Sequence, residues 1–180
     1  MTGIGRLAWA LVATFALSVP AHAELPVGSK APQIETQAAM AGQQYTFSLR
    51  AALRRGPVVL YFYPKAFTQG CTLEAHEFAE KMPEFKAAGA SVIGMSSDDI
   101  ATLKRFSQEE CRNAFPVGVA SPRTVAAYDV ARIVNGKDTG MTTRTSYVIA
   151  RDGAITMVHS DMDYRDHVKL TLAAVRKLSR

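Results

Sequence analysis

Cys71 is the residue of this 180-residue chain best placed for covalent chemistry. It follows an apolar run, Val58 to Tyr63, and ends a P-x-x-x-T-x-x-C spacing that begins at Pro64 and contains Thr68. Because a helical pattern begins directly after the sulfur, we expect Cys71 near the free N–H groups and positive dipole end of a helix. That setting favours the thiolate, which is the form of cysteine that attacks electrophiles.

The elements that must position this cysteine alternate between apolar and amphipathic segments. Continuous apolar runs predict strands at Val58 to Tyr63, Ala90 to Met95 and Phe115 to Ala120. Spacings of three and four predict helices at Thr72 to Ala88, Ile100 to Cys111, Ser121 to Val130 and Tyr164 to Leu178. We expect Pro83 to kink or divide the first helix, and Gly136 to Thr143 to form a loop. Asp152-Gly153 predicts a hairpin joining Ser146 to Ala150 with Ala154 to Val158.

The order of these elements favours an α/β fold. A strand-helix-strand unit is followed by further alternation, a hairpin and a terminal helix, and the length suits one domain. This order predicts a thioredoxin-like fold, with a mixed central sheet and helices on both faces.

The N-terminus has the pattern of a signal peptide. Arg6 supplies a positive charge, Leu7 to Val19 is apolar, and Ala21-His22-Ala23 matches a small-residue cleavage site. We therefore expect residues 1–23 to be removed and a domain of residues 24–180 to function in the periplasm or outside the cell. The apolar stretch is shorter than the roughly 20 residues that a spanning helix needs, so no membrane span is expected.

Export leaves the pairing of the cysteines open, because disulfides persist outside the cytosol. Cys111 is the second of the two cysteines, and a static Cys71–Cys111 bridge in a binding module is one alternative. Thiol-disulfide exchange or metal handling is another, but C-x-x-C and C-x-x-x-C motifs would need cysteines where Glu74 and Ala75 stand.

Four segments resemble the peroxiredoxins, and among them the bacterioferritin-comigratory or PrxQ type. Pro64 to Cys71 (PKAFTQGC) resembles the family's active-site motif, and Thr72 to Glu74 keeps the T-x-E that follows it. Val27 to Pro32 (VGSKAP) resembles the opening segment, and Arg144 to Ile149 (RTSYVI) resembles the strand that carries the active-site arginine. The resemblance covers nearly all of residues 24–180.

The resemblance implies a peroxidase that reduces hydrogen peroxide or organic hydroperoxides and is recycled by a thioredoxin-like dithiol protein. Cys71 would be the peroxidatic nucleophile, and Thr68 would accept a hydrogen bond from the peroxide. Arg144 would polarise the O–O bond and hold the thiolate, while Pro64 would shield the sulfur from water. Glu74 is either a partner of this arginine or an ordinary acid of the first helical turn.

No cofactor is implied, and a metal site is not expected. His76, His159 and His167 show no recognised ligand spacing with Asp161 or Asp163, so we interpret them as single surface or core histidines.

The resolving cysteine departs from one pattern of the family. Many PrxQ-type proteins place it five residues after the peroxidatic cysteine, where this chain has His76. Others place it on the following helix, and there Cys111 lies 40 residues after Cys71. We therefore interpret Cys111 as the resolving thiol, with an inert thiol as the alternative.

The charge of the chain is mildly basic. Removing residues 1–23 takes away Arg6 and no acid, so the formal charge falls from +5 to +4. Because Lys and Arg do not gather in a long run, we expect neither a nucleic-acid partner nor a membrane partner. The oligomeric state that we expect is a monomer or weak dimer.

Overall fold

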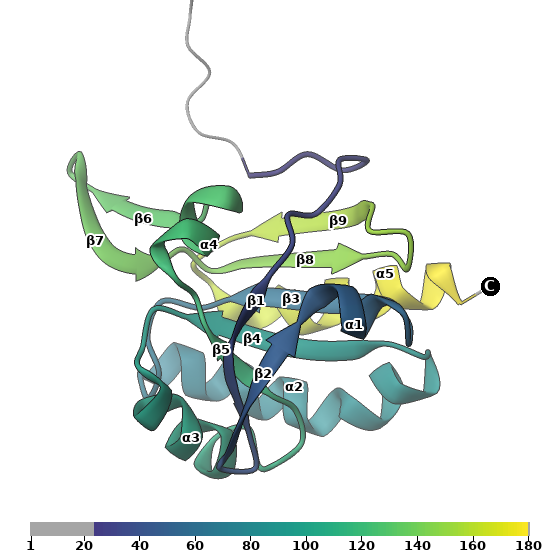
Figure 1. Cartoon of the computed structure of the whole chain (residues 1–180), viewed down its shortest axis with the longest axis horizontal. Helices are drawn as coiled ribbons and strands as arrows, with labels where there is room; N and C mark the ends of the chain where they lie inside the picture. The colour runs from purple at the N-terminus through teal and green to yellow at the C-terminus, as the bar shows by residue number, and fades with distance from the viewer. Residues whose placement is uncertain (1–23, 180) are drawn as a thin grey trace, which may run out of the picture.

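The computed structural model describes residues 24–179, and the expected signal peptide lies outside them (Figure 1). A seven-stranded sheet in the order β2-β1-β5-β4-β3-β8-β9 forms the centre of the molecule. Its strands are β1 (Glu35–Met40), β2 (Gln43–Ser48), β3 (Val58–Phe62), β4 (Ser91–Ser96), β5 (Val117–Val119), β8 (Thr145–Ile149) and β9 (Ile155–Ser160). The β3–β4 and β4–β5 pairs are parallel, whereas the others are antiparallel, so the sheet is mixed as predicted.

Helices cover both faces of this sheet. They are α1 (Leu49–Leu53), α2 (Gln69–Ala87), α3 (Ile100–Glu109), α4 (Pro122–Ala127) and α5 (His167–Leu178), the last preceded by a 3-10 turn η1 (Tyr164–Asp166). β3 shows why the core has two halves, because alternate side chains of a strand point to opposite faces. Val59 and Tyr61 pack with α2, α3 and α5, while Leu60 and Phe62 pack with α1 and the end of α4.

The predicted strand-helix-strand unit around Cys71 is confirmed, with three corrections. α2 begins at Gln69, before Cys71 rather than after it, and Pro83 does not divide it. α3 ends at Glu109, so Cys111 lies beyond the helix that was expected to contain it. The expected loop at Gly136 to Thr143 is wrong, because Lys137–Thr142 forms β7, paired with β6 (Ala131–Val134) in a separate hairpin.

The sheet also contains elements that the sequence did not reveal. β1 and β2 form a hairpin at one edge, and α1 follows directly with Ser48 as its N-cap. The next two helices begin with favourable residues, since Asp99 accepts a hydrogen bond from the Thr102 amide at the start of α3 and Pro122 lies in the first turn of α4. Between residues 24 and 179, no helix has the length and apolar character needed to span a bilayer.

Candidate active site

Cys71 is the third residue of α2 and lies with its sulfur buried under the first turn of that helix. Only 2% of the residue is exposed. Thr68 is the N-cap in extended conformation, and its carbonyl accepts the Thr72 amide at 2.9 Å. Amides of the first turn have no partner within a helix, so Cys71 lies where a helix stabilises negative charge, as predicted.

The loop before Cys71 is held by a carboxylate from the neighbouring strand-helix junction. The Ala66 amide donates to Asp98 Oδ2 at 2.8 Å, and the Ser96 hydroxyl donates to the same oxygen at 2.8 Å. Phe67 has a φ of 62°, a strained value for a residue with a side chain. Asp98 therefore fixes the path of the loop, a role that the sequence did not indicate.

Arg144 reaches Cys71 because of the register between β3 and β8. Phe62 pairs with Thr145, so the chain leaves β3 toward Cys71 at the same edge where Arg144 enters β8. Arg144 Nη2 lies 3.5 Å from Cys71 Sγ, and its Nε donates to the Met162 carbonyl at 3.0 Å. Gly70 leaves room for this approach, since a Cβ there would lie 3.2 Å from Nη2.

Glu74 lies one helical turn after Cys71 and contacts the same arginine, Arg144. Its Oε2 accepts a hydrogen bond from Arg144 Nη1, and both side chains are buried. Burial raises the pKa of Glu74, although the Arg144 guanidinium beside it opposes the rise. Burial lowers the pKa of Arg144, but the Glu74 carboxylate and Cys71 outweigh this effect and leave it above its ordinary value. Of the two interpretations of Glu74, the geometry favours the arginine partner.

A buried histidine lies behind this pair. Burial lowers the pKa of His167 to about 4, so the ring is neutral at pH 7. Its Nε2 is 2.9 Å from the Asp161 carbonyl, which can only accept, so this nitrogen carries the proton. Nδ1 then accepts from the Ser146 hydroxyl at 2.8 Å and lies 3.9 Å from Glu74 Oε1. The sequence predicted a single surface or core histidine and gave no sign of this contact.

Cys111 occupies a different environment in the same core cluster. It is fully buried, and burial together with the nearby Glu110 raises its pKa well above the ordinary value. Burial raises the pKa of Tyr61 and Tyr63 as well, and the thiols of Cys71 and Cys111 both add to that rise. Both cysteines are free, and they lie near the same two tyrosines.

Two side-chain contacts join the flanks of Cys111 to α2. Glu110 Oε2 lies 2.7 Å from His76 Nε2, and Arg112 Nη1 lies 3.2 Å from Glu80 Oε1. We call these two pairs the α2 clasp. The turn that follows Cys111 is strained, because Arg112 and Asn113 have φ values of 50° and 56°.

The remaining site candidates lie around the loop. Pro64 is buried, and Thr68 is exposed with its hydroxyl donating to the Lys65 carbonyl at 2.9 Å. In the part of the chain that the structure describes, no three His, Cys, Asp or Glu side chains are grouped as a metal site would require.

Comparisons with known proteins agree with this geometry. The AhpC/TSA family matches residues 27–158. Peroxiredoxin Bcp of Escherichia coli (strain K12) is 33% identical over 117 residues, which is 64% of this chain and 75% of that protein.

Two solved structures extend the likeness. Peroxidoxin BcpB from Mycobacterium tuberculosis superposes with a TM-score of 0.75 at 31% identity, covering 84% of this chain and 97% of that one. The bacterioferritin comigratory protein of Xanthomonas campestris gives a TM-score of 0.71 at 28% identity, covering 80% and 92%. The chain therefore belongs to the AhpC/TSA family, and within it to the BCP/PrxQ-type peroxiredoxins, which are thiol-dependent peroxidases.

Proposed function

We propose that the chain is a two-cysteine peroxidase in which Cys71 attacks the peroxide and Cys111 resolves the product. The observation that carries the proposal is the contact of the buried Cys71 sulfur with the Arg144 guanidinium, 3.5 Å away. A permanent cation beside a sulfur at a helix N-terminus favours the thiolate. Glu74 and the Met162 carbonyl hold the guanidinium in that position.

In the first step the Cys71 thiolate attacks one oxygen of the O–O bond. The sulfur is oxidised to the sulfenic acid, the O–O bond breaks, and the leaving alkoxide or hydroxide takes up a proton. Arg144 would stabilise the negative charge that develops on the leaving oxygen, because its donors are already held in place. Thr68 would hold the peroxide, since its hydroxyl donates to the Lys65 carbonyl and keeps its lone pairs free to accept the peroxide O–H. Buried Pro64 would keep water from the thiolate.

In the second step the Cys111 thiol attacks the Cys71 sulfenic acid. A disulfide forms and water leaves, and a thioredoxin-like dithiol protein then reduces the bridge to two thiols. Both sulfurs are buried, so their segments must move before they can meet. The strained turn after Cys111 supports a local release of this segment, and so does the Arg112–Glu80 pair, because an exposed ion pair contributes little to stability.

The first test is stopped-flow reaction of the reduced protein with hydrogen peroxide. We expect Cys71→Ser to abolish rapid consumption, while Cys111→Ser keeps the first step at the wild-type rate and then stops at the sulfenic acid. Mass spectrometry after one equivalent of peroxide should show a Cys71–Cys111 disulfide in the wild type. A stable Cys71 sulfenic acid beside a free Cys111 would refute the resolving role and leave the peroxidatic role intact.

We also propose that the protein works in the periplasm, on the basis of the signal-peptide pattern of residues 1–23. Its reductant would then be a dithiol protein of that compartment, since the cytosolic thioredoxin system does not reach it. Cell fractionation with N-terminal sequencing tests this proposal, and an uncleaved cytosolic chain would contradict it.

A further inference from the structure

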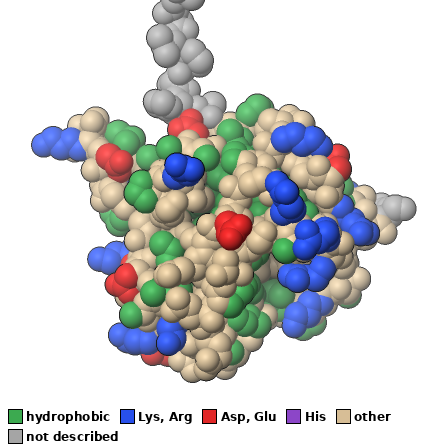
Figure 2. Space-filling model, in the orientation of Figure 1, with side chains coloured by type: hydrophobic (Ala, Val, Ile, Leu, Met, Phe, Trp, Pro, Cys, Tyr) green, Lys and Arg blue, Asp and Glu red, His purple; other side chains and the backbone are tan. Residues whose placement is uncertain are grey.

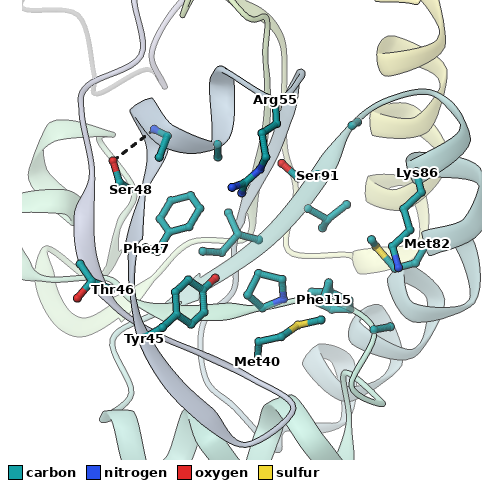
Figure 3. Close-up of a pocket in the computed structure, with 17 residues that line it drawn as sticks. Met40, Tyr45, Thr46, Phe47, Ser48, Arg55, Met82, Lys86, Ser91 and Phe115 are labelled. Carbon is teal, nitrogen blue, oxygen red and sulfur yellow. Dashed lines mark hydrogen bonds between the residues drawn. The ribbon is translucent and has the colours of Figure 1, made fainter.

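A pocket of about 630 Å³ lies at the end of the sheet opposite Cys71 (Figure 3). Cys71 follows the C-terminal end of β3, whereas the pocket adjoins Ser91 to Ile93, the first half of the parallel strand β4. β2, α1 and the C-terminal half of α2 provide the other walls. None of the residues that we place in the peroxidase site lines it.

The pocket exists because β5 is short. β5 has three residues, and its pairing with β4 starts only at Gly94. In the described chain, Ser91 to Ile93 therefore pair with β3 on one side and meet no strand on the other. β1 and β2 lie on the other side of this gap. The strands of the sheet therefore separate at this end and leave a space between them, which we call the wedge.

The walls of the wedge are apolar and well buried. They include Phe47, Val92, Ile93 and Phe115, each at most 6% exposed. The volume falls within the range of about 300 to 1,000 Å³ that is usual for small-molecule sites. The interior therefore suits a flexible hydrocarbon group.

Two cations are among the residues that line the pocket. Figure 3 shows Arg55 and Lys86 reaching toward it from the end of α1 and from α2. No Asp or Glu is found among its 17 lining residues, and neither cation forms an ion pair with another described residue, unlike Arg112, Arg144 and Arg176. The Tyr45 hydroxyl adds a donor near Arg55, as the pKa of Tyr45 indicates: burial raises it and Arg55 opposes the rise.

The surface around the pocket is also basic. Figure 2 shows Lys and Arg side chains gathered on the side where α1 and the end of α5 lie. Exposed Arg50 and Arg54 belong to α1 and its C-cap, and Arg151 is beside them because it donates to the Arg54 carbonyl at 3.1 Å. An anion would be attracted to this face before it reaches the pocket.

We propose that this pocket binds the carboxylate form of a single long-chain fatty acid. The hydrocarbon chain lies in the wedge, and the carboxylate lies between Arg55 and Lys86, with the Tyr45 hydroxyl as a further donor. Charge complementarity selects this occupant over a neutral lipid, because a neutral head group would leave two cations without an anion. Burial of the chain supplies affinity, and each further buried CH₂ should tighten binding about fourfold.

The test is calorimetric titration of the purified protein with dodecanoate below its micellar concentration. We expect saturable binding at one site, about 16-fold tighter than decanoate because two more CH₂ groups are buried. Arg55→Gln and Lys86→Gln should each weaken it about three- to tenfold. Arg50→Gln is the matched control, since Arg50 is exposed on the same helix but does not line the pocket.

A second variant and a second probe make the outcome decisive. Ala51→Leu, which fills part of the wedge from the surface of α1, should weaken binding at least about tenfold with unchanged peroxide reduction at Cys71. Dodecanol should bind more weakly than dodecanoate. Absence of saturation, equal binding of dodecanol, or equal effects of Arg50→Gln and Arg55→Gln would overturn the proposal. A dimer in sedimentation that Ala51→Leu dissociates would overturn it too, because the pocket would then be an interface between copies of the chain.

Discussion

Cys71 and Cys111 lie in one core cluster and are equally hidden from water, yet their charged neighbours have opposite signs. Cys71 lies in the first turn of α2 beside Arg144. Cys111 follows α3 and lies beside Glu110, and its pKa is raised well above the ordinary value by burial and by that acid. The difference teaches that two equally buried thiols can have opposite electrostatic surroundings, and in the proposed mechanism the thiol beside the cation is the nucleophile.

The backbones of the two cysteines differ as well. Cys71 belongs to a helix of 19 residues, behind a loop whose Ala66 amide donates to Asp98, and the Ser96 hydroxyl donates to the same Asp98 oxygen. Cys111 belongs to an irregular segment with two consecutive left-handed residues after it. The first sulfur is therefore positioned for reaction, and the second belongs to the segment that can move.

The largest expected effect comes from removing the cation of Cys71. Arg144→Ala should lower the rate constant of the first step by about 10²- to 10³-fold, because the developing oxyanion and the thiolate lose a fixed donor. Stopped-flow measurements with hydrogen peroxide give this rate, and circular dichroism confirms that the variant is folded. Glu74→Gln, which keeps Arg144, should have a smaller effect. An unchanged rate in Arg144→Ala would show that the neighbouring charge does not explain the difference between Cys71 and Cys111.

Alkylation compares the two thiols directly. With Cys111→Ser and Cys71→Ser providing one thiol each, iodoacetamide at pH 7 should modify Cys71 at least about tenfold faster than Cys111, whose thiolate is scarce. In urea the two rates should converge, because the folded environment is lost. If Cys111 were the faster thiol in the folded protein, the assignment of roles would be reversed.

A pH dependence of stability between pH 4 and 6.5 should arise on the Cys71 side of the core, from His167. The pKa of His167 is lowered from 6.5 to about 4 in the fold, so the unfolded chain binds the extra proton first. The contribution to stability is complete above pH 6.5 and is lost as the pH falls toward 4. The decrease in the free energy of unfolding over this window should be about 1 to 3 kcal/mol smaller for His167→Gln than for the wild type. Parallel urea denaturation curves measure the difference, and equal slopes against pH would show that His167 titrates normally.

The smallest expected effect concerns the mobility of Cys111. Glu80→Gln removes one exposed ion pair of the α2 clasp and should speed disulfide formation about two- to fivefold, leaving the first step unchanged. Glu84→Gln is the control, since Glu84 lies on the same helix but pairs with Lys81 and Arg176. Rapid quench followed by thiol trapping measures the step. Equal rates in both variants would mean that the clasp does not limit the release.

The elements with a strong periodic pattern could be predicted from the sequence, and so could the residues with motif context. β3, β4, α2 and the β8–β9 hairpin were expected near their observed bounds. β1 and β2 could not be recognised because Glu35–Met40 and Gln43–Ser48 carry few β-branched residues. β7 has the pattern of a loop because its side chains are mostly polar, one glycine precedes it and another, Gly140, lies within it.

Within the site, Cys71, Glu74 and Arg144 could be named from their motifs, and the structure places them in contact. Asp98, Ser146 and His167 could not, because their roles arise from packing between segments that are distant in sequence. The environment of Cys111 also depends on where α3 ends. A helix terminus is the feature that periodicity locates least well.

The α2 clasp has a consequence for how much peroxide the protein survives. In the proposed two-cysteine mechanism, a newly formed Cys71 sulfenic acid would wait for Cys111 while Glu110 and Arg112 stay bound to α2, and a second peroxide would then oxidise it to the sulfinic acid. The α2 clasp would thus set how long the sulfenic acid is open to further oxidation. Because salt screens exposed ion pairs, we expect the protein to resist inactivation better at high ionic strength than at low.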